Sequence, residues 1–145
     1  MIPAIITQIA AGDRTISLGS LSPTRDFNFV TDTCAAFKAV AECETALGKV
    51  VNAASNFEIS IGETAALIAD VMNVQVEIKT DKQRLRPEGS EVNRLYGDNS
   101  RLREMTQWSP AFGGREGFRQ GLSITAEWFS DPDNLVRYRP GSYAV

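Results

Sequence analysis

The hydrophobic residues of this chain change their spacing along the sequence, and this change constrains the fold more than any other feature. Ile2, Ile5, Ile6 and Ile9 recur at helical spacing, whereas Val74–Ile78 alternates apolar and polar residues as a half-exposed strand does. Glycines and prolines separate such segments and end them. The pattern predicts a chain in which helices and short strands alternate, which defines the α/β class.

The same signals predict the individual elements. The predicted helices cover residues 1–11, 31–44, 60–73, 98–106 and 114–129. The predicted strands cover residues 15–18, 26–30, 49–52 and 74–78, and residues 80–97 are expected to be mostly loop. Ser60-Ile-Gly-Glu63 is a capping box, while Thr31 or Asp32 and then Asp98 are expected to cap two other helices. We therefore expect a small α/β, α+β-like fold with four or five helices and four to six short strands.

Several aromatic residues are assigned to the apolar side of a helix or to the core. Phe37 is predicted to lie on the apolar side of the helix over residues 31–44. Trp108, Trp128 and Phe129 are best interpreted as core residues as well. With 145 residues, the chain is expected to form one domain over residues 1–130, followed by a tail over residues 131–145.

Composition excludes several classes of function. The chain has no histidine, which excludes histidine acid–base chemistry, a Ser-His-Asp triad and most zinc or iron sites. The net charge of −3 disfavours nucleic acid and anionic membranes as partners. No apolar run approaches the ~20 residues that span a bilayer. Cys34 and Cys43 lie nine residues apart on opposite faces of one predicted helix, so they are expected to be unpaired thiols, as in the cytoplasm.

Motifs of a complete oxidoreductase are missing from the chain. No glycine-rich turn follows a strand, so no dinucleotide cradle is predicted. Tyr96, Tyr138 and Tyr143 each lack a lysine four residues later, so no Tyr-x-x-x-Lys pair is present. We assign no catalytic residue, no metal ligand and no cofactor bound by this chain alone.

Three segments, read in order, resemble the second half of extended short-chain dehydrogenases, the NAD-dependent epimerase/dehydratase family. They are residues 18–32 with Arg-Asp-Phe, residues 50–55 with Val-Val-Asn, and residues 84–101 with Arg-Pro-Glu. Within that family the pattern is most similar to nucleotide-sugar 4,6-dehydratases of the legionaminic-acid type. The resemblance implies the C-terminal, substrate-binding half without the N-terminal Rossmann part, where NAD and the catalytic residues of the intact family lie.

The resemblance also implies a site for the diphosphate of a nucleotide sugar, formed by Arg25, Asn52 and Arg86. Arginine forks and amide donors suit two adjacent phosphates, and Asn52 is expected to end a strand, where ligands of α/β sheets gather. In place of the common Arg-Pro-Gly-Asp of the family, this chain has Arg86-Pro-Glu-Gly89, which adds a carboxylate at Glu88.

Salt bridges offer an alternative for both arginines. Arg25 can pair with Asp26 or Asp32 instead of phosphate. Arg86 can pair with Glu88 or Glu91.

Further contacts are implied for the rest of the ligand. Ile16, Ser17 and Leu18 resemble the strand whose backbone runs along the nucleotide base, although a plain core strand is an equal alternative. Glu91 and Arg94 are candidates for contacts to sugar or ribose hydroxyls, and a solvated charge pair is the alternative.

The resemblance and the missing motifs leave two expected functions for this chain. The first is a nucleotide-sugar-binding domain, inactive alone because the catalytic half is absent. The alternative is an oligomerisation or interaction module, which forms a homo-oligomer or binds the missing Rossmann half through the isoleucines of the predicted helix over residues 1–11.

Overall fold

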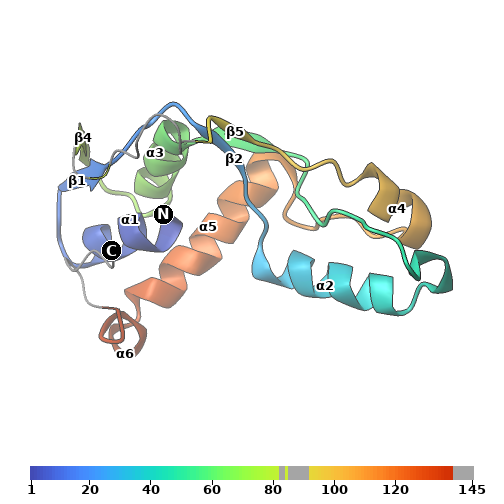
Figure 1. The fold of residues 1–145 in the computed structure, drawn as a ribbon. Helices are drawn as coiled ribbons and strands as arrows, with labels where there is room; N and C mark the ends of the chain where they lie inside the picture. The colour runs from blue at the N-terminus through green and yellow to red at the C-terminus, as the bar shows by residue number, and fades with distance from the viewer. Residues whose placement is uncertain (82–83, 85–91, 139–145) are drawn as a thin grey trace. The chain divides into compact units, whose positions relative to one another are not determined.

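The structure is a computed structural model that describes residues 1–81, 84 and 92–138 (Figure 1). The chain forms two compact units. Unit 1 comprises Met1–Pro23, Ser60–Asn93 and Leu122–Val145, and unit 2 comprises Thr24–Ile59 and Arg94–Gly121. The long helix α5, Gly114–Ser130, begins in unit 2 and ends in unit 1. Helices and short strands are interspersed along the described residues, so the small α/β fold is confirmed, although six α-helices are present there where four or five were predicted.

Unit 1 is a two-stranded parallel sheet with helices packed on it. Its elements are α1 Ile2–Ala10, β1 Thr15–Leu18, α3 Ile61–Val71, β4 Glu77–Thr80, the end of α5, and α6 Pro132–Leu135. The register pairs Thr15 with Glu77 and Leu18 with Thr80. The predicted capping box is confirmed, because the Ser60 hydroxyl accepts from the Glu63 N–H at 3.1 Å and the Glu63 carboxylate accepts from the Ser60 N–H at 3.3 Å.

Three of the four isoleucines of α1 are buried, which corrects the expectation that they are exposed for a neighbouring molecule. Ile5, Ile6 and Ile9 are all in the core. The helix packs on α3 and β1 within unit 1, so these side chains already have their apolar partners. The interaction surface predicted on residues 1–11 is therefore wrong.

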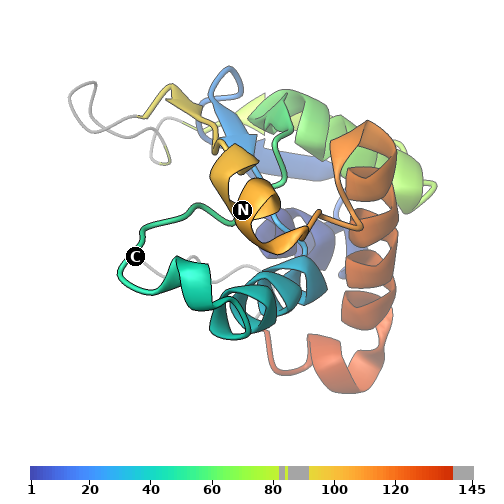
Figure 2. The same cartoon turned by 90° about the vertical axis from the view of Figure 1, so that its right-hand side faces the viewer.

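Unit 2 contains a three-stranded sheet in the order β3-β2-β5, with helices α2 and α4 side by side (Figure 2). Its elements are β2 Thr24–Asp26, α2 Val30–Ala41, the 3-10 helix η1 Glu44–Ala46, β3 Glu58–Ser60, β5 Arg94–Leu95, α4 Ser100–Thr106 and the start of α5. Strands β2 and β5 are parallel. Ala36, Leu102 and Trp108 form the buried cluster between α2, α4 and the turn after α4.

Several predicted boundaries are wrong for identifiable reasons. The strand predicted over residues 26–30 covers Thr24–Asp26, because α2 already begins at Val30. The strand predicted over residues 74–78 begins at Glu77, because the turn after α3 extends to Val74, whose N–H donates to the Ala69 carbonyl. Strand β5 lies in the segment expected to be loop, since a two-residue strand has no readable period.

The strand predicted over residues 49–52 is absent. In the described part of the chain no strand pairs with this segment, and Val50 is exposed. An apolar extended segment becomes a strand only when another strand satisfies its backbone groups.

The predicted caps of α2 and α4 also need correction. Neither Thr31 nor Asp32 caps α2, whose N-cap is Phe29. Asp98 lies one residue before the N-cap Asn99, although its carboxylate does accept from the Ser100 N–H at 2.9 Å.

Two aromatic residues predicted for the core are exposed instead. Trp108 and Phe129 are buried as expected, but Trp128 is 44% exposed and Phe37 is 73% exposed.

The cysteines are free thiols, as expected, but they do not share a helix. Cys34 is exposed on α2, and Cys43 follows the end of that helix. Among the described residues, no helix has both the length and the apolar character needed to cross a bilayer.

Candidate functional site

A hollow of about 410 Å³ lies in unit 2 where two parallel strands end. Its lining residues come from the segment after β2, the extended segment before β3, and the end of β5: Asp26, Asn28, Val51, Asn52, Ala53, Ala54, Leu95, Tyr96 and Gly97. Because β2 and β5 are parallel, their carboxyl ends meet at one edge of the sheet. This edge is where open α/β sheets bind ligands, and the volume suits a small molecule.

Asp26 joins three parts of the wall of this hollow. Its carboxylate accepts from the Ser55 N–H at 2.9 Å, the Ser55 hydroxyl at 2.6 Å, the Asn56 N–H at 3.1 Å and the Gly97 N–H at 3.3 Å. Asn56 has a φ of 60°, a left-handed conformation that asparagine tolerates better than most residues. A side chain at Gly97 would collide with the Cβ of Ala54, so the close approach of these two backbone segments requires glycine.

Three asparagine amides hold the extended segment that contains Asn52. Asn28 donates to the Ala53 carbonyl at 2.6 Å, and buried Asn99 donates to the Ala54 carbonyl at 2.8 Å. The Asn52 amide nitrogen donates to the Asp98 carbonyl at 3.3 Å. That nitrogen carries a second hydrogen, which can donate to an anionic ligand oxygen in the hollow.

Arg25 lies beside this hollow in the chain but is not one of its lining residues. Its guanidinium is half-buried and donates to the Thr24 carbonyl at 2.7 Å. Side chains alternate along a strand, so Arg25 and Asp26 leave β2 on opposite faces. Arg86 falls outside the described residues. Convergence of Arg25, Asn52 and Arg86 on one diphosphate therefore stays a prediction.

Arg94 is held by a carboxylate that sequence reasoning did not pair with it. Its Nε and Nη2 donate to the two oxygens of Glu58 on β3, with separations between 2.7 and 3.2 Å. Glu58 also accepts from the Thr24 hydroxyl at 2.9 Å, and the Arg94 guanidinium lies 5.1 Å from the ring centre of Tyr96. Hydrogen bonds from Arg94 and then Thr24 hold the pKa of Glu58 below its usual range. Glu91, the other predicted sugar contact, lies outside the described residues.

The lowered pKa of Glu58 predicts a pH-dependent contribution to stability. A carboxyl whose folded pKa is depressed stabilises the fold above its unfolded pKa of about 4.3, and this contribution is lost as the pH falls through the folded value. We expect the Tm difference between the native chain and Glu58→Gln to be largest near neutrality and to shrink below about pH 4. Thermal unfolding followed by circular dichroism across this range measures it. Glu104→Gln, at an exposed carboxylate on α4, is the control, and equal pH profiles for the two variants would contradict the prediction.

The predicted base-binding strand is β1 of unit 1. Ile16 and Leu18 are buried, and the Ser17 carbonyl accepts from the Arg84 guanidinium at 2.9 Å. The strand also pairs with β4 along its whole length. Core packing accounts for Ile16 and Leu18, and their role beside a nucleotide base stays a prediction.

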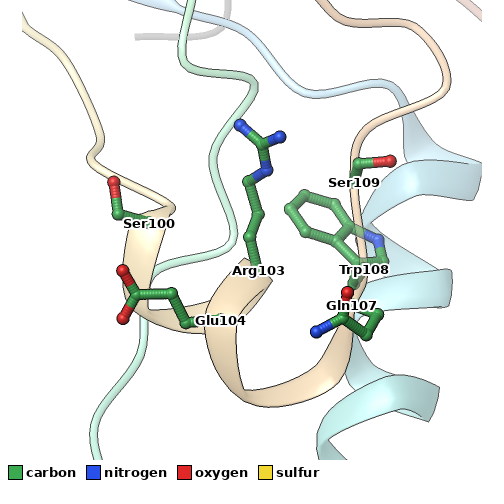
Figure 3. Close-up of a pocket in the computed structure, with 6 residues that line it drawn as sticks. All are labelled: Ser100, Arg103, Glu104, Gln107, Trp108 and Ser109. Atoms are coloured by element: carbon green, nitrogen blue, oxygen red, sulfur yellow. The ribbon is translucent and has the colours of Figure 1, made fainter.

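A second hollow in unit 2, of about 470 Å³, contains none of the predicted site residues. It is lined by residues of α4 and the turn after it: Ser100, Arg103, Glu104, Gln107, Trp108 and Ser109. Figure 3 shows the side chains of these six residues, with the Glu104 carboxylate on the side of Ser100 in this view. Trp108 Nε1 is buried without a hydrogen-bond partner among the described residues. Sequence reasoning gave no role to this hollow.

Sequence reasoning also missed Asp26, Asn28 and Tyr96 as lining residues of the first hollow. No clear signal in the sequence pointed to Asp26 and Asn28, because the strand was predicted over residues 26–30, whereas Asp26 is the last residue of β2 and Asn28 follows it. Tyr96 gave no signal either, since β5 was not predicted.

Comparisons with known proteins place this fold in the class of extended short-chain dehydrogenases. An epimerase from Methanothermobacter thermautotrophicus superposes with a TM-score of 0.80 over 95% of this chain and 39% of its own, at 24% identity. A UDP-N-acetylglucosamine 4-epimerase from Methanobrevibacter ruminantium, solved with UDP-N-acetylmuramic acid, gives 0.74 over 89% of this chain and 38% of its own, at 25% identity.

The chain belongs to the GDP-mannose 4,6 dehydratase family, whose sequence profile matches residues 1–121. It is 31% identical over 115 residues to the GDP-6-deoxy-D-mannose reductase of Pseudomonas aeruginosa. That match covers 79% of this chain but only 36% of the relative. The chain thus spans well under half the length of the relatives that it matches.

Proposed function

We propose that this chain binds a nucleotide sugar as the substrate-binding part of an NAD-dependent sugar-nucleotide 4,6-dehydratase or epimerase. Arg25, Asn52 and Arg86 bind the diphosphate in this proposal. The backbone of Ile16–Leu18 runs along the base, and Glu91 and Arg94 contact sugar or ribose hydroxyls. The chain acts in the cytoplasm and is inactive without the half that binds NAD in the intact family.

The observation that supports this proposal most is the position of Asn52. Asn52 ends the Val-Val-Asn segment that carries part of the family resemblance, and it lines the hollow where the parallel strands β2 and β5 end. Ligand binding at that edge is a general property of open α/β sheets. Membership of the GDP-mannose 4,6 dehydratase family supports a nucleotide sugar as the ligand.

Chemistry also favours a diphosphate over a neutral ligand. Each guanidinium presents a planar fork of donors that matches phosphate oxygens, and charge-assisted hydrogen bonds are about twice as strong as neutral ones. Asn52 adds a neutral amide donor, which binds an anionic oxygen without drawing a competing carboxylate. Arg94 is already paired with Glu58, so its role toward the sugar depends on exchange of that partner for a hydroxyl.

The proposal predicts ligand-dependent stabilisation that requires Arg25. UDP-, dTDP- and GDP-sugars at millimolar concentration are tested in turn, and the matching nucleotide sugar is expected to raise the Tm by mass action. Arg25→Ala is expected to weaken binding roughly 10- to 100-fold, the equivalent of one charge-assisted hydrogen-bonding group. Differential scanning fluorimetry measures both effects.

Arg14→Ala is the matched control, because Arg14 also donates to the carbonyl of the preceding residue, at 3.0 Å, but is exposed in unit 1. It should leave the ligand-induced Tm shift unchanged. Absence of a shift with all three classes of nucleotide sugar would overturn the proposed function.

A further inference from the structure

Tyr96 is the one aromatic ring among the described lining residues of the hollow that contains Asn52. It follows strand β5 directly, and 41% of its surface is exposed. A tyrosine ring is mostly apolar, so an exposed ring in a hollow leaves apolar surface that a ligand can cover. The proposed function gives this ring no role, although it shares the hollow with the amide assigned to the diphosphate.

Arg94 holds the Tyr96 ring from one side. The two residues are two positions apart along an extended segment, so their side chains leave the backbone on the same face. The guanidinium carbon of Arg94 lies over the Tyr96 ring, 5.1 Å from its centre, where a cation is attracted to the ring. The Glu58 carboxylate fixes that guanidinium by accepting from its Nε at 2.9 Å and its Nη2 at 2.7 Å. A ring supported in this way has less freedom to lose when a ligand binds, which favours affinity.

Part of the ring remains open to the hollow. Tyr96 is a lining residue and Arg94 is not, so the ring meets the hollow with surface that the guanidinium leaves uncovered. Val51 and Leu95 also line the hollow, and Asn52 supplies an amide. The hollow therefore has apolar and polar walls, a combination that suits a ligand with both kinds of surface.

The hexose is the part of a nucleotide sugar that matches these walls. It is bonded directly to the diphosphate, which the proposed function assigns in part to Asn52, whereas the ribose separates the base from the diphosphate. A pyranose ring carries hydroxyl groups at its edge and C–H groups on its faces, so one face can pack on an aromatic ring while the hydroxyls meet polar groups. The ribose is equally close to the diphosphate, but its smaller, puckered ring offers no extended C–H face.

We propose that Tyr96 packs against the C–H face of the hexose of a nucleotide sugar, and that Arg94, held by Glu58, positions the Tyr96 ring. This inference rests on the proposed function and adds a sugar contact to it. It also gives Arg94 a role that is compatible with its pairing to Glu58, whereas a direct contact to a sugar hydroxyl requires that pair to open.

The test compares each nucleotide sugar with its free nucleoside diphosphate, by isothermal titration calorimetry on the whole chain. The probes are UDP-glucose, dTDP-glucose and GDP-mannose, alongside UDP, dTDP and GDP. Tyr96→Ala is expected to weaken binding of the nucleotide sugar roughly 5- to 30-fold, because an apolar contact is lost. The same variant should change the Kd of the free diphosphate by less than about 3-fold, and Tyr96→Phe, which keeps the ring, should stay within about 3-fold for both ligands.

The positioning role of Arg94 is tested by combining two variants. Arg94→Gln is expected to weaken nucleotide-sugar binding in the native background and to have no further effect in Tyr96→Ala, because positioning acts only through the ring. In NMR spectra, the ring protons of Tyr96 should shift on addition of the nucleotide sugar and not on addition of the free diphosphate. An equal effect of Arg94→Gln in both backgrounds would overturn the positioning role.

Tyr138→Ala is the matched control, because Tyr138 is 43% exposed and also lies against neighbouring side chains, the rings of Trp128 and Phe129, but does not line the hollow. It should leave every Kd unchanged. Circular dichroism checks that Tyr96→Ala is folded, and Tyr96→Leu replaces it if not.

Two results separate this inference from the proposed function. A nucleotide sugar that binds the native chain and Tyr96→Ala equally well, or a loss that is the same for the free diphosphate, would overturn the contact between Tyr96 and the hexose and leave the proposed function intact. Failure of all three nucleotide sugars and all three diphosphates to bind the native chain would overturn the proposed function, and this inference with it.

Discussion

Replacement of Asp32 by alanine is expected to lower the free energy of unfolding by about 2–4 kcal/mol. Asp32 is only 4% exposed, and its two carboxylate oxygens accept from the N–H groups of Ala111 at 3.0 Å and Phe112 at 2.9 Å. These donors belong to the turn before α5, far from Asp32 in sequence. Without the carboxylate, two backbone donors in a part-buried turn lose their acceptors, and hydrogen bonds to charged groups contribute about 1.5–3 kcal/mol each.

Urea unfolding at neutral pH measures this loss. Asp32→Asn retains one acceptor oxygen and should lose about half as much stability as Asp32→Ala. Asp13→Ala, at an exposed aspartate just after α1, should change stability by less than about 0.5 kcal/mol. If Asp32→Ala and Asp13→Ala have the same unfolding midpoint, the turn before α5 does not depend on this carboxylate.

Asp32 also illustrates where the sequence was misleading. An aspartate at the start of an apolar periodic segment predicts a helix cap, which is a local hydrogen bond. In the structure the same carboxylate bonds to residues 79 and 80 positions away. Local rules predicted the helix itself, because its period is a property of neighbouring residues. The bonding partners of a buried carboxylate depend on the tertiary fold, which no local pattern records.

The strands show the same difference between features that neighbouring residues determine and features that the tertiary fold determines. The strand over Thr15–Leu18 and the capping box at Ser60 were predicted correctly from a few adjacent residues. The segment over residues 49–52 has an apolar strand pattern, yet it has no pairing partner in the described chain. Strand β5 has two residues and exists because it pairs with β2. Strand pairing is a long-range property, so the sequence of one segment does not determine it.

The candidate site was likewise predictable in part. Asn52 was found through the family resemblance, and the structure places it in the wall of a hollow. Glu58, the partner of Arg94, was not found, because it comes from β3, 36 residues earlier in the chain. Asp26 was noticed only as a possible salt-bridge partner of Arg25, whereas in the structure it organises the wall around Asn52.

This role of Asp26 leads to the second large expected effect. Asp26→Ala is expected to lower the free energy of unfolding by about 2–3 kcal/mol, because three backbone N–H groups and one hydroxyl lose a common charged acceptor. Solvent reaches part of this site, which keeps the loss below the sum of four separate bonds. The bonds join Asp26 to residues 29 to 71 positions away, so their removal should also loosen the hollow.

Urea unfolding and amide hydrogen exchange of Ser55, Asn56 and Gly97 measure these two consequences of Asp26→Ala. Asp98→Ala is the matched control, because its carboxylate also accepts from one N–H and one hydroxyl, at 2.9 and 2.6 Å, but both belong to Ser100, two residues away. A bond within one turn restrains little of the tertiary fold, so this variant should lose no more than about 1 kcal/mol and should leave exchange at Ser55 unchanged. Equal losses for the two aspartates would contradict the prediction, because Asp26 accepts four hydrogen bonds from distant residues whereas Asp98 accepts two within one turn. Faster exchange at Ser55 in Asp26→Ala alone would instead identify Asp26 as the residue that holds this part of the wall in place.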